Sequence, residues 1–189
     1  MVEIIIGSIF ISNYVFGKFL GICPTVGVSN KISTSFGMGM AVTFVTTIAS
    51  IVTKLIYDYI LVEFNLEYLR TIAFILVIAS LVQFVEMFMK KSMPSLYKAL
   101  GVFLPLITTN CMVLGVAIIN IDNGYTMAET IVNSIAASVG FMLAIILLSG
   151  IRERYDNVKL PKAFEGAPMA MLALGLMALA FMGFNGFNI

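Results

Sequence analysis

LPLITTNCMVLG, residues 104–115, places a proline, two threonines, an asparagine and a cysteine inside a strongly apolar stretch. Pro105 removes a backbone hydrogen bond from any helix that continues through it. The side chains of Thr108, Thr109 and Asn110 are suited to cap a helix that starts again. The stretch therefore predicts an interrupted helix with Cys111 in the first turn of its second half, where the helix dipole stabilises negative charge.

A second stretch, FLGICPTVG at residues 19–27, repeats this pattern around the other cysteine of the chain. Pro24 follows Cys23 directly and disfavours helical geometry at Cys23 itself. Gly21 and Gly27 lie on either side. Both cysteines are thus expected where an apolar helix breaks.

The composition around these stretches is that of an integral membrane protein. Of 189 residues, 60% are hydrophobic and 11% are charged, against about 25% charged in soluble domains, and the mean hydropathy is +1.04. A net charge of +1 without a basic cluster argues against nucleic acid as a partner. The absence of histidine removes the commonest general base and a frequent metal ligand. The first segment has no basic n-region, so we expect it to remain in the mature protein.

Six apolar runs are long enough to cross a bilayer, whose hydrocarbon core needs about 20 residues per helix. They extend approximately over 4–28, 36–58, 69–89, 99–120, 127–150 and 167–187. We therefore predict an all-α integral membrane protein that forms a single transmembrane domain over residues 1–189.

The distribution of basic residues predicts the orientation of these spans. With the N-terminus outside, two cations, Lys54 and Arg70, fall at outer ends and nine at inner ends. The nine are Lys18, Lys31, Lys90, Lys91, Lys98, Arg152, Arg154, Lys159 and Lys162. We expect both termini outside and the segment 151–166 in the cytoplasm.

Three spans in each half predict an internal repeat in which the second copy is inverted. The halves are about 1–95 and 96–189. Ser12-Asn13 in span 1 corresponds to Thr109-Asn110 in span 4, and a glycine follows each pair. Inverted repeats commonly place their site at the midplane on discontinuous helices, and both cysteines lie in such stretches.

Whether the two cysteines can meet depends on span 1. Cys111 would lie about 18 Å into a straight span 4, whereas Cys23 would lie only about 8 Å from the inner end of a straight span 1, a mismatch of roughly 7 Å. A shared site therefore requires a broken span 1. From the residues alone, ordinary buried thiols, a disulfide and a shared metal site remain open. Two thiolates are too few for an iron–sulfur cluster, which takes four, so a second chain would have to supply the others.

Five long stretches resemble the membrane subunits of the Rnf and sodium-pumping NADH:quinone reductase complexes. They are FLGICPTVGVSNKISTSFGMGMA (19–41), RTIAFILVIASLVQFVEM (70–87), LYKALGVFLPLITTNCMVLGVAIIN (96–120), GFMLAIILLSGIRER (140–154) and GLMALAFMGFNGF (175–187). Within this family the chain is more similar to the A subunit of Rnf than to the E subunit of the quinone reductase, because a proline follows Cys23 and the connection 59–68 is short.

This resemblance implies a six-helix subunit of two inverted three-helix repeats, with broken half-helices in spans 1 and 4. Such a subunit pairs with a homologous E subunit of opposite topology, and each contributes two cysteines, here Cys23 and Cys111, to one intramembrane [2Fe-2S] cluster. The complex, which also contains D, G, B and C subunits in a bacterial or archaeal cytoplasmic membrane, moves electrons between ferredoxin and NAD and couples this flow to Na+ or H+ transport. The subunit would relay electrons without being catalytic alone.

Other polar residues in the apolar runs are candidates for an ion path. Thr43, Thr46, Thr47 and Ser50 form a stripe at helical spacing, although small polar residues also serve helix-to-helix hydrogen bonding. Glu86 is an intramembrane carboxylate that Lys90 could pair with at four-residue spacing. Asn110, beside Cys111, is a further candidate.

Two rival functions use the same features. A secondary transporter also has inverted repeats and broken helices but needs no iron. A purely structural subunit would tolerate replacement of both cysteines without loss of turnover.

Overall fold

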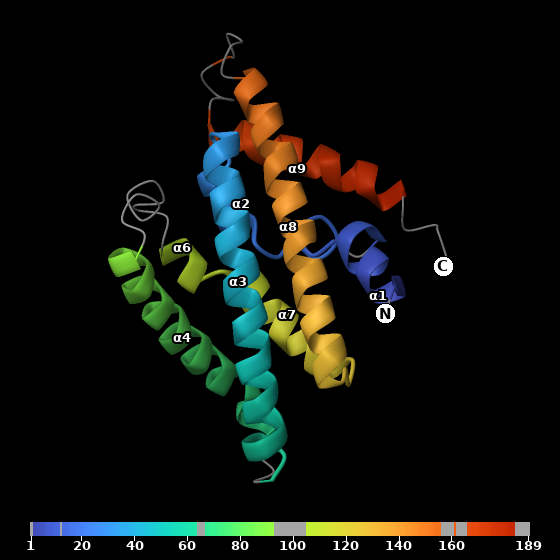
Figure 1. The fold of residues 1–189 in the computed structure, drawn as a ribbon. Coiled ribbons are helices and arrows are strands. Elements are labelled where there is room, and N and C mark those ends of the chain that lie inside the picture. Colours follow the sequence, from blue (N-terminus) through green and yellow to red (C-terminus); the bar gives the residue numbers. More distant parts are fainter. Residues whose placement is uncertain are drawn as a thin grey trace.

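A computed structural model of the protein describes residues 2–11, 13–63, 67–92, 105–155, 161 and 166–183. Its regular elements are all helical within these ranges (Figure 1). In chain order they are α1 (Val2–Ile6), η1 (Gly7–Ile11), α2 (Ile22–Val28), α3 (Ile32–Ile56), η2 (Tyr57–Leu61), η3 (Glu67–Leu69), α4 (Arg70–Ser92), α6 (Pro105–Thr108), α7 (Cys111–Asp122), α8 (Met127–Tyr155) and α9 (Ala167–Met182).

Three stretches of helix are long and apolar enough to cross a membrane: Ile32–Leu61, Arg70–Met87 and Met127–Tyr155. Two shorter apolar helices, α7 and α9, accompany them. The beginning of the expected span 99–120 and the end of the expected span 167–187 lie outside the described residues. The chain is thus an all-helical, multi-pass membrane protein, as its composition predicts.

The long helices α3 and α8 run side by side through the middle of the molecule (Figure 1). They are antiparallel, because Glu153 near the end of α8 accepts a hydrogen bond from the backbone N–H of Ile32 at the start of α3, at 3.0 Å. Gly39 allows the two helices to approach closely, since a Cβ atom there would lie 2.5 Å from Met142 Cγ. This pair forms the frame on which the other helices pack.

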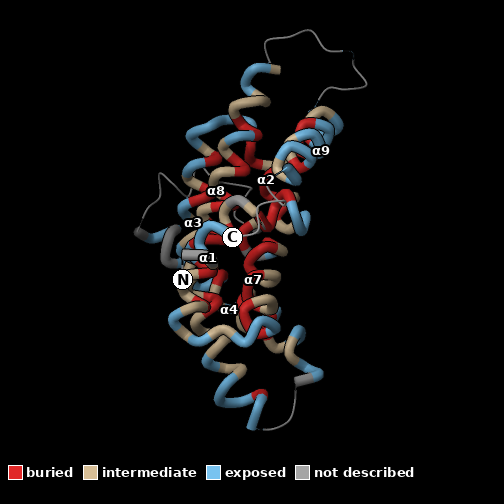
Figure 2. Tube along the Cα trace, turned by 90° about the vertical axis from the view of Figure 1, so that its right-hand side faces the viewer, coloured by how far each residue is buried: buried red, intermediate tan, exposed pale blue. Residues whose placement is uncertain are grey.

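Residues coloured as buried lie along the stretches where the helices meet, and exposed residues lie along the outer parts of the same helices (Figure 2). Fully buried large residues come from α3, α4, α7 and α8, among them Met38, Val42, Phe74, Met112, Phe141, Ile145 and Leu148. The exposed faces are also apolar: Phe36, Met40, Phe44, Leu76, Phe84, Leu176 and Leu179 are all exposed. A surface of this kind suits lipid or a partner subunit rather than water.

The charged residues that the structure describes mark the two ends of the helix frame. At one end, Arg70 of α4 pairs with Asp122 of α7 at 2.6 Å, and Lys54 pairs with Asp58 one turn along at 3.2 Å. Arg152 and Arg154 lie at the other end, in the last turn of α8. The two groups of cations therefore separate much as the sequence predicts; Lys98, Lys159 and Lys162 lie outside the described residues.

Lys18 is the exception to this separation. It lines a cavity together with Asn123 and Tyr125, which belong to the turn between α7 and α8, at the end where Arg70 pairs with Asp122. The expectation that Lys18 lies at the inner end was therefore wrong. That expectation assumed a straight helix through residue 28, whereas the chain leaves the helical path after Ile11 and turns before Gly21.

Candidate metal centre at two helix interruptions

The first interruption separates η1 from α2. The turn between them is closed by hydrogen bonds from Gly17 N to the Asn13 carbonyl at 2.7 Å and from Leu20 N to the Tyr14 carbonyl at 2.9 Å. The Asn13 side chain accepts from Val15 N at 2.9 Å and donates to the Gly140 carbonyl of α8 at 3.0 Å. Asn13 therefore attaches the interrupted segment to the helix frame.

Cys23 itself is helical, contrary to the expectation drawn from Pro24. The helix α2 begins at Ile22, so Pro24 occupies its first turn. There the backbone N–H that proline lacks has no partner within the helix, and the proline is tolerated. The helix break lies two residues before Cys23, at Gly21, whose φ is +82°.

The second interruption separates α6 from α7 at Thr109 and Asn110. Asn110 is the N-cap of α7: its backbone is extended, and its Oδ1 accepts a hydrogen bond from Met112 N at 3.0 Å. Cys111 is the first residue of α7. The predicted capped restart, with the cysteine in the first turn, is confirmed, and Asn110 is the residue that caps it.

The two interruptions meet. The backbone N–H of Gly21 donates to Cys111 Sγ at 2.9 Å, and Leu20 fits against the bare backbone of Gly115, where a Cβ atom would lie 2.5 Å from Leu20 Cδ1. Since Cys23 follows Gly21 by two residues, its Cα lies within about 12 Å of the Cys111 sulfur. The break in span 1 thus removes the depth mismatch that a straight helix would impose.

The two cysteines differ in exposure. Cys23 is exposed on the surface of the chain, Cys111 is half-buried, and both are free thiols. Because the Cys23 side chain is exposed, it is not an ordinary buried core thiol. The two sulfurs also do not form a disulfide in this structure. The arrangement leaves one thiol facing outward and the other held by a backbone donor.

This donor set fits half of an iron–sulfur site. Among the described residues, no cluster of three or more cysteine, aspartate or glutamate side chains could hold a metal ion within the chain. A [2Fe-2S] cluster takes four ligands, so two thiols are consistent with a site completed by a second chain. A nearby donor is also unused: Asn110 is 3% exposed, and its Nδ2 has no hydrogen-bond partner among the described residues.

The threonine stripe on α3 divides into two groups. Thr43 Oγ1 donates to the Gly39 carbonyl and Thr47 Oγ1 to the Thr43 carbonyl, both at 2.8 Å. In contrast, Thr46 Oγ1 and Ser50 Oγ are buried and have no hydrogen-bond partner in the part of the chain that the structure describes. The hydroxyl protons of Thr43 and Thr47 are thus committed to backbone carbonyls, whereas those of Thr46 and Ser50 are not, within the described residues. Glu86 is half-buried in α4, one turn beyond the buried Val82.

A buried polar network escaped the sequence-based predictions. Asn133 of α8 accepts from Ser8 Oγ at 2.5 Å and donates to Tyr14 Oη at 3.2 Å and to Asn120 Oδ1 at 2.6 Å, and Asn120 donates to Ser134 Oγ at 3.1 Å. The sequence did contain a signal for this network, namely Asn120 and Asn133 within apolar spans. An asparagine side chain is costly there unless it is hydrogen-bonded.

This network borders the cavity that contains Lys18. The cavity has a volume of about 310 Å³, enough for on the order of ten water molecules. Its polar lining is Ser8, Tyr14, Lys18, Asn123, Tyr125 and Asn133, and the Lys18 ammonium lies 5.3 Å from the centre of the Tyr14 ring.

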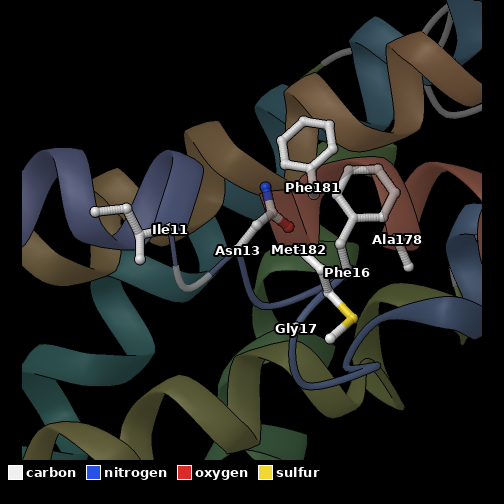
Figure 3. A pocket seen from close by; sticks show the side chains of 7 residues that line it. All are labelled: Ile11, Asn13, Phe16, Gly17, Ala178, Phe181 and Met182. Carbon is white, nitrogen blue, oxygen red and sulfur yellow. The ribbon is translucent and has the colours of Figure 1, made fainter. Parts of the chain in front are cut away.

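A smaller pocket lies on the other side of the first interruption, against α9 (Figure 3). Its volume is about 30 Å³. The ring centroids of Phe16 and Phe181, two of its lining residues, are 4.5 Å apart. The contact holds α9 against the turn that precedes Cys23. The pocket itself is too small for more than a few water molecules.

Fold and site together define a multi-pass, all-helical membrane protein that presents two cysteines at two adjoining helix starts. A family model described as "Rnf-Nqr subunit, membrane protein" matches residues 1–188. The chain therefore belongs to the Rnf-Nqr family of membrane subunits.

Known relatives cover almost the whole chain. It is 57% identical over 189 residues, covering 100% of this chain and 98% of the relative, to the A subunit of the Na(+)-translocating ferredoxin:NAD(+) oxidoreductase complex of Acetobacterium woodii. It is 52% identical over 183 residues to the A subunits of the ion-translocating oxidoreductase complexes of Syntrophotalea carbinolica and Vibrio vulnificus, with 97% of this chain and 95% of each relative covered.

Proposed function

We propose that this chain is a membrane subunit of an ion-translocating ferredoxin:NAD oxidoreductase complex. In this complex, Cys23 and Cys111 supply two of the four ligands of an intramembrane [2Fe-2S] cluster. The names and full-length coverage of the relatives support the complex. One observation carries the cluster: Gly21 N–H donates to Cys111 Sγ at 2.9 Å, which brings together the two segments that contain the cysteines.

The protein groups in this site have separate roles. Asn110 caps α7 and so fixes the position of Cys111. The N-terminus of the 12-residue helix α7 stabilises negative charge on that sulfur. The exposed Cys23 is available to a site at a subunit interface. When bound, the cluster would supply one-electron transfer.

The remaining two ligands come, in this proposal, from a homologous E subunit of opposite topology. D, G, B and C subunits complete the complex in the cytoplasmic membrane. Our chain has six spans arranged as two inverted repeats, with both termini outside. The antiparallel α3 and α8, each the longest helix described in its half, and the interruptions in both halves support this arrangement.

Coupling to Na+ or H+ follows from electrostatics. A four-thiolate cluster is anionic, and burying a further electron in low dielectric is costly unless a cation approaches. Among the candidates for an ion path, Thr46 and Ser50 have unpartnered buried hydroxyls within the described part of the chain. The Nδ2 of Asn110, unpartnered among the described residues, is a hydrogen-bond donor, so a cation there would have to be met by its Oδ1, which also accepts from Met112 N. Glu86 is the intramembrane carboxylate among these candidates.

The second candidate function within the family is that of the E subunit of a Na+-translocating NADH:quinone reductase. The co-purified complex separates the two: it either oxidises reduced ferredoxin with NAD or reduces quinone with NADH. A secondary transporter or a structural subunit would need no iron.

The test is iron content and low-temperature EPR of the intact, dithionite-reduced complex for wild type, Cys23→Ser and Cys111→Ser. Gly150→Ala serves as a control, because a Cβ atom at Gly150 would meet nothing within 4 Å. Loss of about two irons and of one [2Fe-2S] signal in both cysteine variants, with the complex still assembled, supports the proposal. Unchanged iron and an unchanged signal would return both cysteines to a structural role.

A further inference from the structure

We infer that Gly21 is a positioning residue for this metal centre: its backbone N–H holds the Cys111 sulfur and raises the reduction potential of whatever redox group that sulfur ligates. The inference rests on the proposed function, since it presumes a cluster on Cys111. The inference assigns a role to a residue that has no side chain. It rests on the hydrogen bond between Gly21 N and Cys111 Sγ, which are 90 positions apart in the sequence.

Both backbone groups of Gly21 are committed. Its carbonyl accepts from Thr25 Oγ1 at 2.6 Å and from Thr25 N at 3.2 Å, which fixes it to the first turn of α2. Its N–H belongs to a helix N-cap, where backbone donors have no partner within the helix. That N–H is therefore free to serve another acceptor, and Cys111 Sγ is the acceptor it meets.

Only glycine satisfies this geometry. The φ of +82° at Gly21 lies in the left-handed region, which costs other L-residues energy. In addition, a Cβ atom would lie 2.9 Å from Phe141 Cε2 and 3.3 Å from Met112 Cβ. Both neighbours are fully buried, so neither can move aside cheaply.

The same neighbours protect the hydrogen bond. Phe141 and Met112 close the Cβ side of Gly21, which is itself buried, and this limits the access of water to its N–H donor. A hydrogen bond in such surroundings is electrostatically stronger than one in water. Hydrogen bonds to ligand sulfurs stabilise the more negative, reduced state of an iron–sulfur centre and so raise its potential.

The first variant is Gly21→Ala in the complete complex, with an EPR-monitored redox titration as the readout. We expect a midpoint potential lower by about 59 mV, the equivalent of a tenfold change in a one-electron equilibrium. Gly124→Ala is the matched control, because Gly124 also has a positive φ, +64°, but a Cβ atom there would meet nothing within 4 Å. This control should titrate as wild type does.

If Gly21→Ala does not assemble, the comparison moves to Phe141→Leu and the double variant Gly21→Ala/Phe141→Leu. The smaller side chain relieves the closest clash so that the complex can assemble, while the positive φ at position 21 and Met112 Cβ at 3.3 Å still shift the backbone N–H away from the sulfur. A lower potential in the double variant than in Phe141→Leu supports the role of Gly21. Equal potentials overturn it.

The failure of this inference is distinguishable from failure of the proposed function. If the signal persists in Cys111→Ser, the cluster is not on this cysteine and the proposed function fails. If the signal depends on Cys111 but Gly21→Ala titrates with the wild-type potential, only the role of Gly21 is refuted.

Discussion

The guanidinium of Arg152 in α8 donates a hydrogen bond to the carbonyl of Val26 in α2 at 2.6 Å. The same nitrogen reaches Ser29 Oγ at 2.9 Å. A positive group thus meets the C-terminal end of the short helix that carries Cys23, where the helix dipole favours a cation. Cys111 of α7 contacts Gly21 at the start of α2, and Arg152 of α8 contacts Val26 near its end. This seven-residue helix is therefore fixed at both ends.

Replacing Arg152 should therefore loosen α2. Arg152→Ala removes charge-assisted hydrogen bonds, and we expect a loss of about 2 kcal/mol in stability together with lower iron content per complex. Arg152→Lys should restore only part of the stability and iron content, because it keeps the positive charge but not the planar guanidinium that places one nitrogen against both acceptors. The measurements are the thermal inactivation midpoint and iron per complex.

Arg154→Ala is the control for this change, since Arg154 is exposed in the same last turn of α8. An equal loss of iron in Arg154→Ala and Arg152→Ala would show that charge at this end of the protein matters and that the contact with α2 does not.

The network around Asn133 makes a second prediction. Asn133→Ala leaves Ser8, Tyr14 and Asn120 without the partner they share. Unpaired buried polar groups cost about 1–3 kcal/mol each, so we expect a clear drop in the melting temperature of the purified complex. The exposed Asn123 provides the control: Asn123→Ala should melt within the error of wild type. A wild-type melting temperature for Asn133→Ala would contradict the assignment of this network as structural.

Much of the site could be predicted from local chemistry. The residues Pro105 to Cys111 and the glycines around Cys23 indicate interrupted helices, because proline, glycine and capping side chains act on their immediate neighbours. The long helices were predictable for the same reason, since hydrophobic run length is a local property. Thus the broken segments and the capped restart at Cys111 agree with the sequence.

The rest depends on contacts between distant segments, which no local pattern encodes. The sequence does not say that Gly21 reaches Cys111, because that contact depends on how α2 and α7 pack. It placed Lys18 at the wrong end, because the position of that residue depends on the path of the turn after Ile11. It also misjudged Pro24, whose effect depends on where α2 starts.

The close approach of α3 and α8 at Gly39 gives a third prediction. In Gly39→Ala the new Cβ atom would lie 2.5 Å from Met142 Cγ and 2.9 Å from Met142 Cβ, so one helix must shift. Overpacking of this kind costs about 1–3 kcal/mol. Since Met142→Ala removes the Cγ contact at 2.5 Å but keeps the Cβ contact at 2.9 Å, the double variant should recover part of the loss in a thermodynamic cycle.

The cycle is measured as melting temperatures of the four complexes in detergent. Gly150→Ala on α8 adds a methyl group that meets nothing within 4 Å and should not lower the melting temperature. Strictly additive effects of Gly39→Ala and Met142→Ala would contradict a direct contact between these positions.

The last prediction separates an ion path from helix packing on α3. The Thr46 hydroxyl is buried with no hydrogen-bond partner among the described residues, so Thr46→Val, which keeps the shape, should leave stability unchanged or raise it. If Thr46 serves an ion, the same variant should lower the number of ions moved per electron in proteoliposomes. Thr43→Val is the control, because that hydroxyl is already bonded to the Gly39 carbonyl at 2.8 Å. Equal ion-to-electron ratios in both variants and wild type would identify the whole stripe as a packing surface between α3 and its neighbours.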